Sequence, residues 1–345
     1  MKQNNYLLNF LKVTFFALLL IATSPVRAEI KVVTTIKPLH SLIANVMDGV
    51  GEPSLIIEDS TSPHSFTLKP SHAKLLEEAD LIFWVGEGIE TFMERPLESI
   101  VKNAEVVEFM EVESIEKLKF REESIYGDHD DHNDHDDHDD HDDHDEDHDG
   151  HDDHDEDHDD HDDHDDHDDH ADHEGHNHGE FDAHIWLDPM NAKEMVHEIA
   201  HELGHLDPTN KDKYEANADA TILALDQLIE DVSKDINKDA KFVVFHDAYQ
   251  YFEERFGVRA EGALTLNTDV LPGAKQIDEI QDVIKDRGIN CIFSEPQFNP
   301  KIITTIAKDT NIKTGVFDPL GANINSDKDL YFKLISNLGS ELKGC

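Results

Sequence analysis

The chain has 345 residues and a formal net charge of −49 at neutral pH. Most of that charge lies in one segment, because residues 128–180 contain 26 Asp and 4 Glu but no Lys or Arg, which leaves −19 for the rest of the chain. Such an acidic protein is a poor partner for nucleic acid or an anionic membrane, and it attracts cations. The chain outside this segment and the N-terminal 28 residues is long enough for one large domain or two lobes.

The first 28 residues resemble a secretory signal peptide. Lys2 and Lys12 precede an apolar stretch that runs from Val13 to Ala22, and Val26-Arg27-Ala28 follows as a cleavage site. The alternative is a transmembrane anchor, but about ten apolar residues are too few to cross about 30 Å of hydrocarbon. We therefore expect export and cleavage after Ala28.

Strands alternate with helices along the rest of the chain. Strands are predicted at residues 30–36, 55–57, 81–85, 106–109, 242–245, 263–264, 292–293 and 313–317. Helices are predicted at residues 38–50, 89–100, 189–206, 208–236 and 274–285, and also from Pro70, Pro300 and Lys328. This alternation indicates an α/β fold with parallel sheets.

The helix predicted at 208–236 is long enough to join two lobes rigidly, at roughly 42 Å for a rise of 1.5 Å per residue. We therefore expect a first lobe at 29–207, a linking helix at 208–238 and a second lobe at 239–345. The acidic segment 128–180 is an insertion in the first lobe.

The insertion repeats Asp-Asp-His and contains 17 of the 25 His of the chain between residues 128 and 178. We expect it to be disordered, because it has almost no apolar surface to bury. Imidazoles and carboxylates at this density bind zinc, copper or nickel at many weak sites. The alternative is a charged, solubilising linker. A disordered segment would collect metal, so a selective site is expected in the folded parts.

Three His lie at the ends of predicted strands or in the loops after them: His64, His184 and His246. Ligands of open α/β sheets bind beyond the carboxyl ends of the strands. Three imidazoles with one oxygen atom can form a tetrahedral zinc site. Spacing alone does not distinguish such ligands from ordinary loop residues.

The chain resembles the ZnuA type of periplasmic zinc-binding component of bacterial zinc ABC importers. The matching motifs are Pro63-His64-Ser65-Phe66, Lys69-Pro70-Ser71, Ala79-Asp80-Leu81, Trp84-Val85-Gly86, the His-rich insertion, His184-Ile185-Trp186-Leu187-Asp188-Pro189, Phe245-His246-Asp247-Ala248-Tyr249-Gln250-Tyr251-Phe252, Ser294-Glu295-Pro296-Gln297-Phe298 and Asp318-Pro319-Leu320-Gly321. The resemblance implies the metal-binding solute-binding protein fold of cluster A-I, in which one long rigid helix joins two α/β lobes.

The resemblance also implies a function and a set of ligands. A monomeric periplasmic receptor would capture Zn²⁺ between its lobes and deliver it to the membrane permease of an ABC transporter. His64 and His184 would come from the first lobe and His246 from the second, where an imidazole instead of a carboxylate favours zinc over manganese. Many zinc-binding members have an acidic residue where this chain has Pro63. The fourth ligand is therefore open between Asp318 and water.

An enzyme is the rival hypothesis. Residues 197–205 contain His-Glu-x-x-His in two overlapping frames, a pattern typical of zinc metalloproteases in which a Glu activates zinc-bound water. A metzincin also needs a downstream Met, but all six Met precede the motif, at positions 1, 47, 93, 110, 190 and 195. The same residues also fit an ordinary amphipathic helix, with Met195, Ile199 and Leu203 facing the core.

The two cysteines, Cys291 and Cys345, are expected to form a disulfide, because pairing is favoured in an exported chain. The bond would attach the C-terminal helix to the second lobe. The alternative is two free thiols.

Overall fold

The computed structural model describes residues 30–121, 180–265, 273–308, 310 and 312–345. All described residues belong to one compact unit. The predicted signal peptide and the Asp/His-rich segment lie outside the described residues, apart from Glu180. Within the described ranges, the search for a helix with the length and apolar character of a bilayer span found none.

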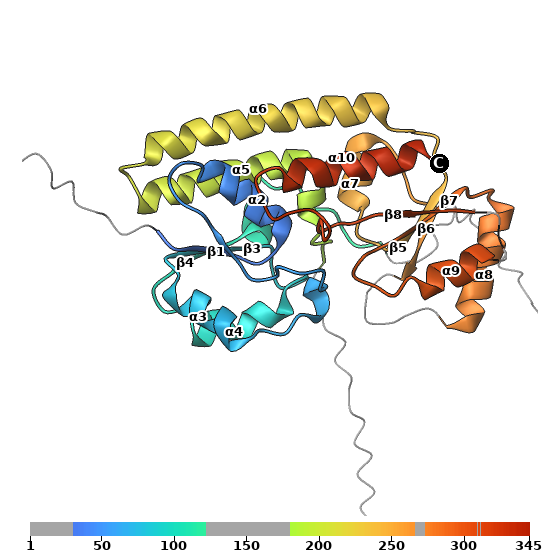
Figure 1. The fold of residues 1–345 in the computed structure, drawn as a ribbon, viewed down its shortest axis with the longest axis horizontal. Coiled ribbons are helices and arrows are strands. Elements are labelled where there is room, and N and C mark those ends of the chain that lie inside the picture. The colour runs from blue at the N-terminus through green and yellow to red at the C-terminus, as the bar shows by residue number, and fades with distance from the viewer. Residues whose placement is uncertain (1–29, 122–179, 266–272, 309, 311) are drawn as a thin grey trace, which may run out of the picture. The chain divides into compact units, whose positions relative to one another are not determined.

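The first sheet has four parallel strands in the order β2-β1-β3-β4 (Figure 1). Its strands are β1 (Val32–Thr34), β2 (Ser54–Leu55), β3 (Leu81–Trp84) and β4 (Glu105–Glu108), and its helices are α2 (Lys37–Val46), α3 (Pro70–Glu78) and α4 (Glu94–Ser99). Every residue of β1 and β3 is buried. Burial on both faces explains why these strands are almost continuously apolar in sequence.

The second sheet repeats this topology with the order β6-β5-β7-β8. Its strands are β5 (Phe242–His246), β6 (Gly262–Thr265), β7 (Cys291–Ser294) and β8 (Lys313–Val316), and its helices are α7 (Gln250–Phe256), α8 (Ala274–Asp286) and α9 (Lys301–Lys308). The neighbouring central strands β5 and β7 end at His246 and Ser294, so the residues at and after these ends meet at one edge of the sheet.

Three further helices complete the fold: α5 (Pro189–Leu206), α6 (Lys211–Asp235) and α10 (Leu330–Lys343). α6 is the predicted long helix, with 25 residues, and it packs against α5, α10 and α2 (Figure 1). Asp188 caps α5 by accepting a hydrogen bond from the Met190 N–H, and Pro189 occupies the first turn, where its missing N–H costs nothing.

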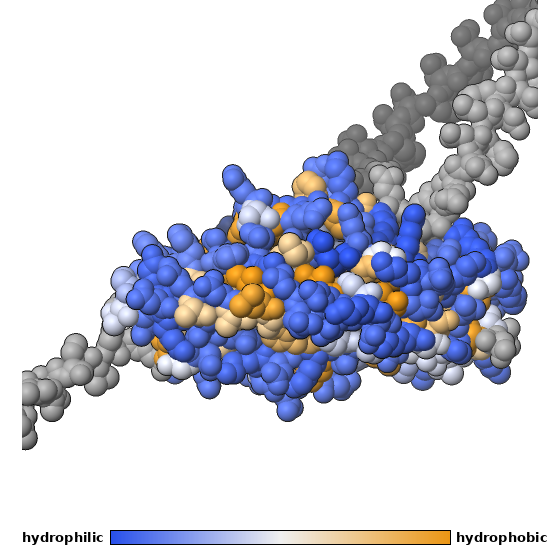
Figure 2. All heavy atoms as spheres, turned by 90° about the horizontal axis from the view of Figure 1, so that it is seen from above, coloured by the Kyte–Doolittle hydropathy of each residue, from blue (hydrophilic) through white to orange (hydrophobic). Residues whose placement is uncertain are grey.

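The C-terminal helix packs against elements of the first half of the chain. The hydroxyl of Ser41 in α2 donates to the Lys328 carbonyl at 2.9 Å and accepts from the Tyr331 N–H at 3.1 Å. One hydrophobic core contains buried side chains of both sheets, and a smaller cluster lies beside the second sheet. Seen from the α6 side, most of the surface is hydrophilic, and hydrophobic side chains gather near its middle (Figure 2).

Three predictions about the helices differ from the structure. The helix expected at 89–100 is shorter, because a continuous helix would bring the ring of Pro96 against the carbonyl of Phe92; α4 instead begins at Glu94, with Pro96 in its first turn. The helix expected at 38–50 ends at Val46. Helix α7 was not predicted at all, although Gly257, with φ of 65°, gives it the left-handed residue that commonly follows a helix.

The predicted disulfide is present. It joins Cys291, the first residue of β7, to Cys345, the last residue of the chain, over a sequence separation of 54. The covalent bond therefore links the second sheet to the end of α10.

Candidate metal centre

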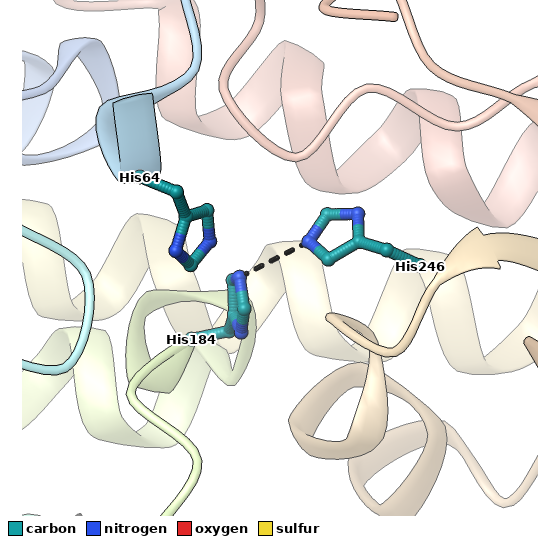
Figure 3. Close-up of side chains that lie close together, drawn as sticks. All are labelled: His64, His184 and His246. Atoms are coloured by element: carbon teal, nitrogen blue, oxygen red, sulfur yellow. Dashed lines mark hydrogen bonds between the residues drawn. The ribbon is translucent and has the colours of Figure 1, made fainter. Parts of the chain in front are cut away.

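The structure brings together the three His that the sequence singled out. Among the described residues, His64, His184 and His246 form a group in which one nitrogen atom from each ring lies within 4.8 Å of the others. Their ring centroids are 5.2 to 6.0 Å apart. Figure 3 shows the three rings pointing toward one another from three separate segments.

His246 is fixed by the neighbouring strand. It is the last residue of β5 and is 4% exposed. Glu295 directly follows β7, and its Oε1 atom lies 2.6 Å from His246 Nδ1. With Nδ1 donating to this carboxylate, the neutral ring presents a lone pair on Nε2 toward the centre of the group.

His184 has the same arrangement in a different segment. It directly precedes the short 3₁₀ helix Ile185–Leu187 and is 5% exposed. Asp182 Oδ1 lies 2.7 Å from His184 Nδ1 and also accepts the His184 backbone N–H at 3.0 Å. The hydroxyl of Tyr251 in α7 donates to the Asp182 carbonyl at 2.6 Å. Tyr251, in the helix after β5, thus holds the loop that carries His184 just before α5.

His64 comes from the loop after β2. It lies in the 3₁₀ turn Pro63–Ser65, whose first residue is the buried Pro63. Proline in that position has a φ already suited to the first residue of a helical turn, which favours the turn that carries His64. His64 is half-buried, whereas the other two rings are buried.

The Nε2 atoms of His184 and His246 lie 3.3 Å apart (Figure 3). Because both Nδ1 atoms face carboxylates, two lone pairs point at each other, which is favourable only with a proton or a cation between them. Burial alone would lower the pKa of His246, but Glu295, followed by Asp247 and Asp182, raises it above its ordinary value. The same negative field attracts a metal cation.

The cleft beside these rings is very small. It is lined by His64, His184 and His246 together with Trp186, Glu295 and Leu320, and its volume is about 10 Å³. A space of this size holds roughly one water-sized sphere. The cleft therefore has room for a single ion.

Asp318 lies near the cleft but is used differently from the three His. Its Oδ1 accepts the Leu320 N–H at 3.2 Å and its Oδ2 accepts the Ala322 N–H at 2.6 Å. The amide of Gln297 donates to Oδ1 at 3.2 Å. Among the described residues, the group of candidate ligand atoms contains the three imidazoles and not this carboxylate.

The loop shaped by Asp318 is also attached to the start of α2, the helix that follows β1. The Lys37 ammonium, which follows β1, donates to the carbonyls of Gly321, Ala322 and Ile324 at 3.2, 3.0 and 2.9 Å. Burial is the largest effect on the Lys37 pKa and lowers it, although Asp318 acts in the opposite direction. The Trp186 indole N–H donates to the Pro319 carbonyl at 2.8 Å, which makes a second attachment of this loop.

Sequence reasoning missed the two carboxylates that hold the imidazoles. The motif Ser294–Phe298 includes Glu295 but gives it no role, and Asp182 belongs to none of the matching motifs. The detectable signals were an acidic residue two positions before His184 and another at the end of the strand next to β5. The second signal needs the strand order, which the sequence does not give.

The His of helix α5 are not part of the cleft. His197, His201 and His205 line a groove between α5 and α6, together with residues such as Glu215 and Asp219. Each candidate metal group on this helix contains only one His. The pair of His on one ion that a metalloprotease requires is therefore not formed among the described residues.

Two parallel sheets that contribute His to one ion-sized cleft define the class of metal-specific solute-binding proteins. The family described as "Zinc-uptake complex component A periplasmic" (ZnuA) matches residues 32–345. High-affinity zinc uptake system protein ZnuA of Brucella abortus (strain 2308) is 48% identical over 316 residues, covering 91% of each chain. The protein of the same name from Haemophilus influenzae is 38% identical, covering 94% of this chain and 95% of the relative.

Solved structures agree on the fold. A structure described as ZnuA has a TM-score of 0.65 at 20% identity, covering 90% of this chain and 98% of its own. A zinc-bound ZnuA with residues 138–173 deleted has a TM-score of 0.66 at 20% identity, covering 91% and 96%. At these identities the likeness shows the fold alone.

The chain belongs to the ZnuA family of periplasmic zinc-uptake components. It is the zinc-binding receptor of a zinc importer that works with an ABC permease, and it is not an enzyme. The metalloprotease alternative is not supported.

Proposed function

We propose that His64, His184 and His246 are the protein ligands that hold Zn²⁺ in the cleft. The observation that carries this proposal is the pair of Nε2 atoms 3.3 Å apart, each on a ring whose Nδ1 faces a buried carboxylate. Carboxylate–imidazole pairs of this kind orient metal ligands and make them more basic. Three imidazoles suit zinc better than the hard cations magnesium and calcium.

The fourth position is open to water or Asp318, and the contacts favour water. Both carboxylate oxygens of Asp318 already accept backbone N–H groups, at 3.2 and 2.6 Å. A move toward the metal would leave those donors without their acceptor, at about 1–3 kcal/mol for each buried group. We assign Asp318 the role of shaping the loop that closes the cleft.

The chain is proposed to act as an exported monomer, cleaved after Ala28, that passes Zn²⁺ to the permease. Its division into a first lobe (29–207), a linking helix (208–238) and a second lobe (239–345) is supported by the two sheets and by the 25 residues of α6. The net charge of −49 makes nucleic acid an unfavourable partner.

The Asp/His-rich run at 128–178 is proposed to collect zinc at many weak sites beside the selective cleft. Its 17 His give far more imidazoles than one site needs. A passive buffer in which this run is the whole function is the competing hypothesis. The three buried or half-buried rings of the cleft argue against it.

Calorimetric titration of zinc into the mature protein, with and without residues 128–178, tests the proposal. We expect the shortened protein to bind fewer ions, to keep one tight site and to unfold in one cooperative thermal transition. Retention of the tight site would place it in the folded part of the chain. If the shortened protein folds but binds no zinc tightly, the run itself is the receptor and the cleft proposal is wrong.

A further inference from the structure

A second set of metal-ligand side chains lies on the outer face of α5. Its central residue is Glu202, which belongs to two groups of candidate ligands: Glu198, His201 and Glu202, and Glu105, Glu202 and His205. In each group one ligand atom from every residue lies within 4.8 Å of the others. We call these five residues the Glu202 ridge.

The helix itself sets the geometry of the first group. Positions 198, 201 and 202 differ by three and four residues and therefore share one face. His201 Nδ1 lies 2.8 Å from Glu202 Oε1. His201 is 12 positions into α5, about 18 Å along the axis from its start, so this group is distinct from the cleft.

The second group joins α5 to the first sheet. Glu105 is the first residue of β4, and its Oε1 lies 3.8 Å from His205 Nδ1. Glu105 and Glu202 are half-buried and His205 is exposed, so the group is accessible from solvent. A site that takes ligands from both a helix and a strand is less flexible than one on a single surface helix.

The carboxylates of the ridge have no Lys or Arg ion-pair partner among the described residues. Of the lysines on α5 and α6, Lys193 lies 2.7 Å from Asp226, and Lys211, which lines the same groove as His201 and His205, lies 3.6 Å from Glu215. In the described part of the chain, the ion pairs within 4.0 Å of Glu105 and Glu202 are those with His205 and His201. This local excess of negative charge beside two imidazoles attracts a cation.

The ridge also borders open space. His201 and His205, with His197, line a groove of about 460 Å³ between α5 and α6. An ion bound here would keep water in its remaining positions, whereas the cleft has room for about one water-sized sphere. Imidazole mixed with carboxylate suits zinc and its neighbours in the transition series.

We propose that the Glu202 ridge is a second, weaker binding site for a divalent cation of the zinc class. Glu202 is the shared ligand, and the other protein ligands of the ion are Glu198 with His201 or Glu105 with His205. The site explains the overlapping His-Glu-x-x-His frames without catalysis, because only one His enters each group. This proposal does not depend on the ligands of the cleft.

The test measures hydrogen exchange at the imidazole C2 carbon of individual His in the full chain, by mass spectrometry. Exchange proceeds through the protonated ring, so metal coordination at either nitrogen slows it. Zn²⁺ would be varied in a chelating buffer that fixes the free concentration, which prevents depletion by the Asp/His-rich run. We expect His201, His205 or both to slow only at free zinc above that which fills the cleft, while His197 stays unchanged as a reference on the same helix.

Two matched variants sharpen the test. Glu202→Gln should raise the free zinc needed for slowing by at least about tenfold, the lower end of the loss seen for outer-shell changes in metal sites. Glu194→Gln makes the same substitution on the same helix outside both groups and should change nothing. Unchanged exchange at both His201 and His205, or an unaltered midpoint in Glu202→Gln, would overturn the proposal.

The outcome is separable from that for the cleft, because His184 and His246 are read in the same experiment. If those two respond and the ridge does not, the second site is wrong and the cleft proposal stands. If only the ridge responds, the ridge is supported and the cleft assignment fails.

Discussion

The cleft and the outer face of α5 contain the same residue types but differ in how the imidazoles are held. In the cleft, His184 and His246 are 5% and 4% exposed, and each has its own buried carboxylate. On α5, His201 and His205 are exposed, and their carboxylates are half-buried. The ligands of the cleft come from three segments, whereas four of the five ridge residues lie on one helix.

The difference shows why spacing along a sequence is a poor guide to a tight site. The His-Glu-x-x-His pattern is compact and conspicuous, yet α5 turns its His toward an open groove. His64, His184 and His246 are far apart in sequence and meet only because of the fold. In the cleft, burial and the carboxylate contact at Nδ1 limit rotation of the His184 and His246 rings, so less conformational freedom is lost when the metal binds.

The largest expected effect is on zinc affinity when a cleft ligand is removed. Tight structural zinc sites are worth about 10–16 kcal/mol, so an equal share for each of three protein ligands is about 3–5 kcal/mol, or roughly a thousandfold in affinity. We expect this loss for His246→Ala in protein lacking residues 128–178, measured by competition with a zinc-binding dye.

His201→Ala in the same shortened protein is the matched control for that loss. Its tight affinity should equal that of the parent, because His201 lies outside the cleft. The receptor assignment fails if His246→Ala binds zinc like its parent while His201→Ala does not.

The disulfide tests whether the fold can lose stability while the cleft keeps its zinc affinity. It closes a loop with a sequence separation of 54, and the chain-entropy model gives about 4 kcal/mol for a loop of this size. A phosphine reductant should lower the melting temperature but leave tight zinc binding intact in protein that is still folded. The melting temperature of Cys345→Ser should not respond to the reductant. A free-thiol assay of the denatured, unreduced protein checks the bond itself, since two reactive thiols would contradict it.

Glu90 is a buried carboxyl group without an imidazole partner, and it tests how burial changes the pKa of such a group. Burial raises its pKa from 4.5 to about 7, although its Oε2 accepts the backbone N–H groups of Val85 and Gly86. The folded state therefore holds a proton that the unfolded state releases between these pH values. The stabilising contribution of the protonated group is complete below about pH 4.5 and is lost as the pH rises through about 7, by about 3 kcal/mol in total.

Glu90→Gln should remove this part of the pH dependence. Denaturant titrations at several pH values between 4.5 and 7 would show a smaller fall in the free energy of unfolding for the variant. Glu77→Gln, an exposed substitution in α3, should follow the parent protein. If the Glu90→Gln and parent curves stay parallel, Glu90 keeps its charge throughout this range.

The smallest effect concerns the carboxylates that hold the cleft imidazoles. Removing an outer-shell partner typically costs about 10–100-fold in metal affinity. Glu295→Ala and Asp182→Ala should each fall in this range, whereas Glu295→Gln should lose less, because an amide oxygen can still accept the Nδ1 proton. The same dye competition measures all three. If the alanine variants bind as tightly as the parent, the Nδ1 contacts do not support the ligands.

Much of the fold was predictable because local signals agreed with it. Asp188-Pro189 marks the start of α5, and the apolar runs at Leu81 and Phe242 mark buried strands that the structure contains. Helix α7 was missed because it is only seven residues long and its aromatic residues give no clear period. Its Tyr251 and Arg255 hold Asp182 and Asp188, and both contacts join segments that are distant in sequence.

The site was predictable only in part. The three His could be proposed from their positions after strands and from family resemblance, and the structure brings their rings together. The partnership of His246 with Glu295 depends on β5 and β7 being neighbours, which a chain read residue by residue does not reveal. The sequence likewise does not show that the Asp318 carboxylate already accepts backbone N–H groups, because these contacts depend on the conformation of its loop.

The bonds of Lys37 to the loop at 321–324 bear on the lifetime of the bound ion. Any motion that carries this loop away from the first sheet must separate one ammonium from three carbonyls. A hydrogen bond to a charged group is worth about 1.5–3 kcal/mol, so each one slows such a motion by roughly tenfold or more. Lys37 is not among the residues that line the cleft, yet it adds to the barrier for any opening of the cleft that moves this loop.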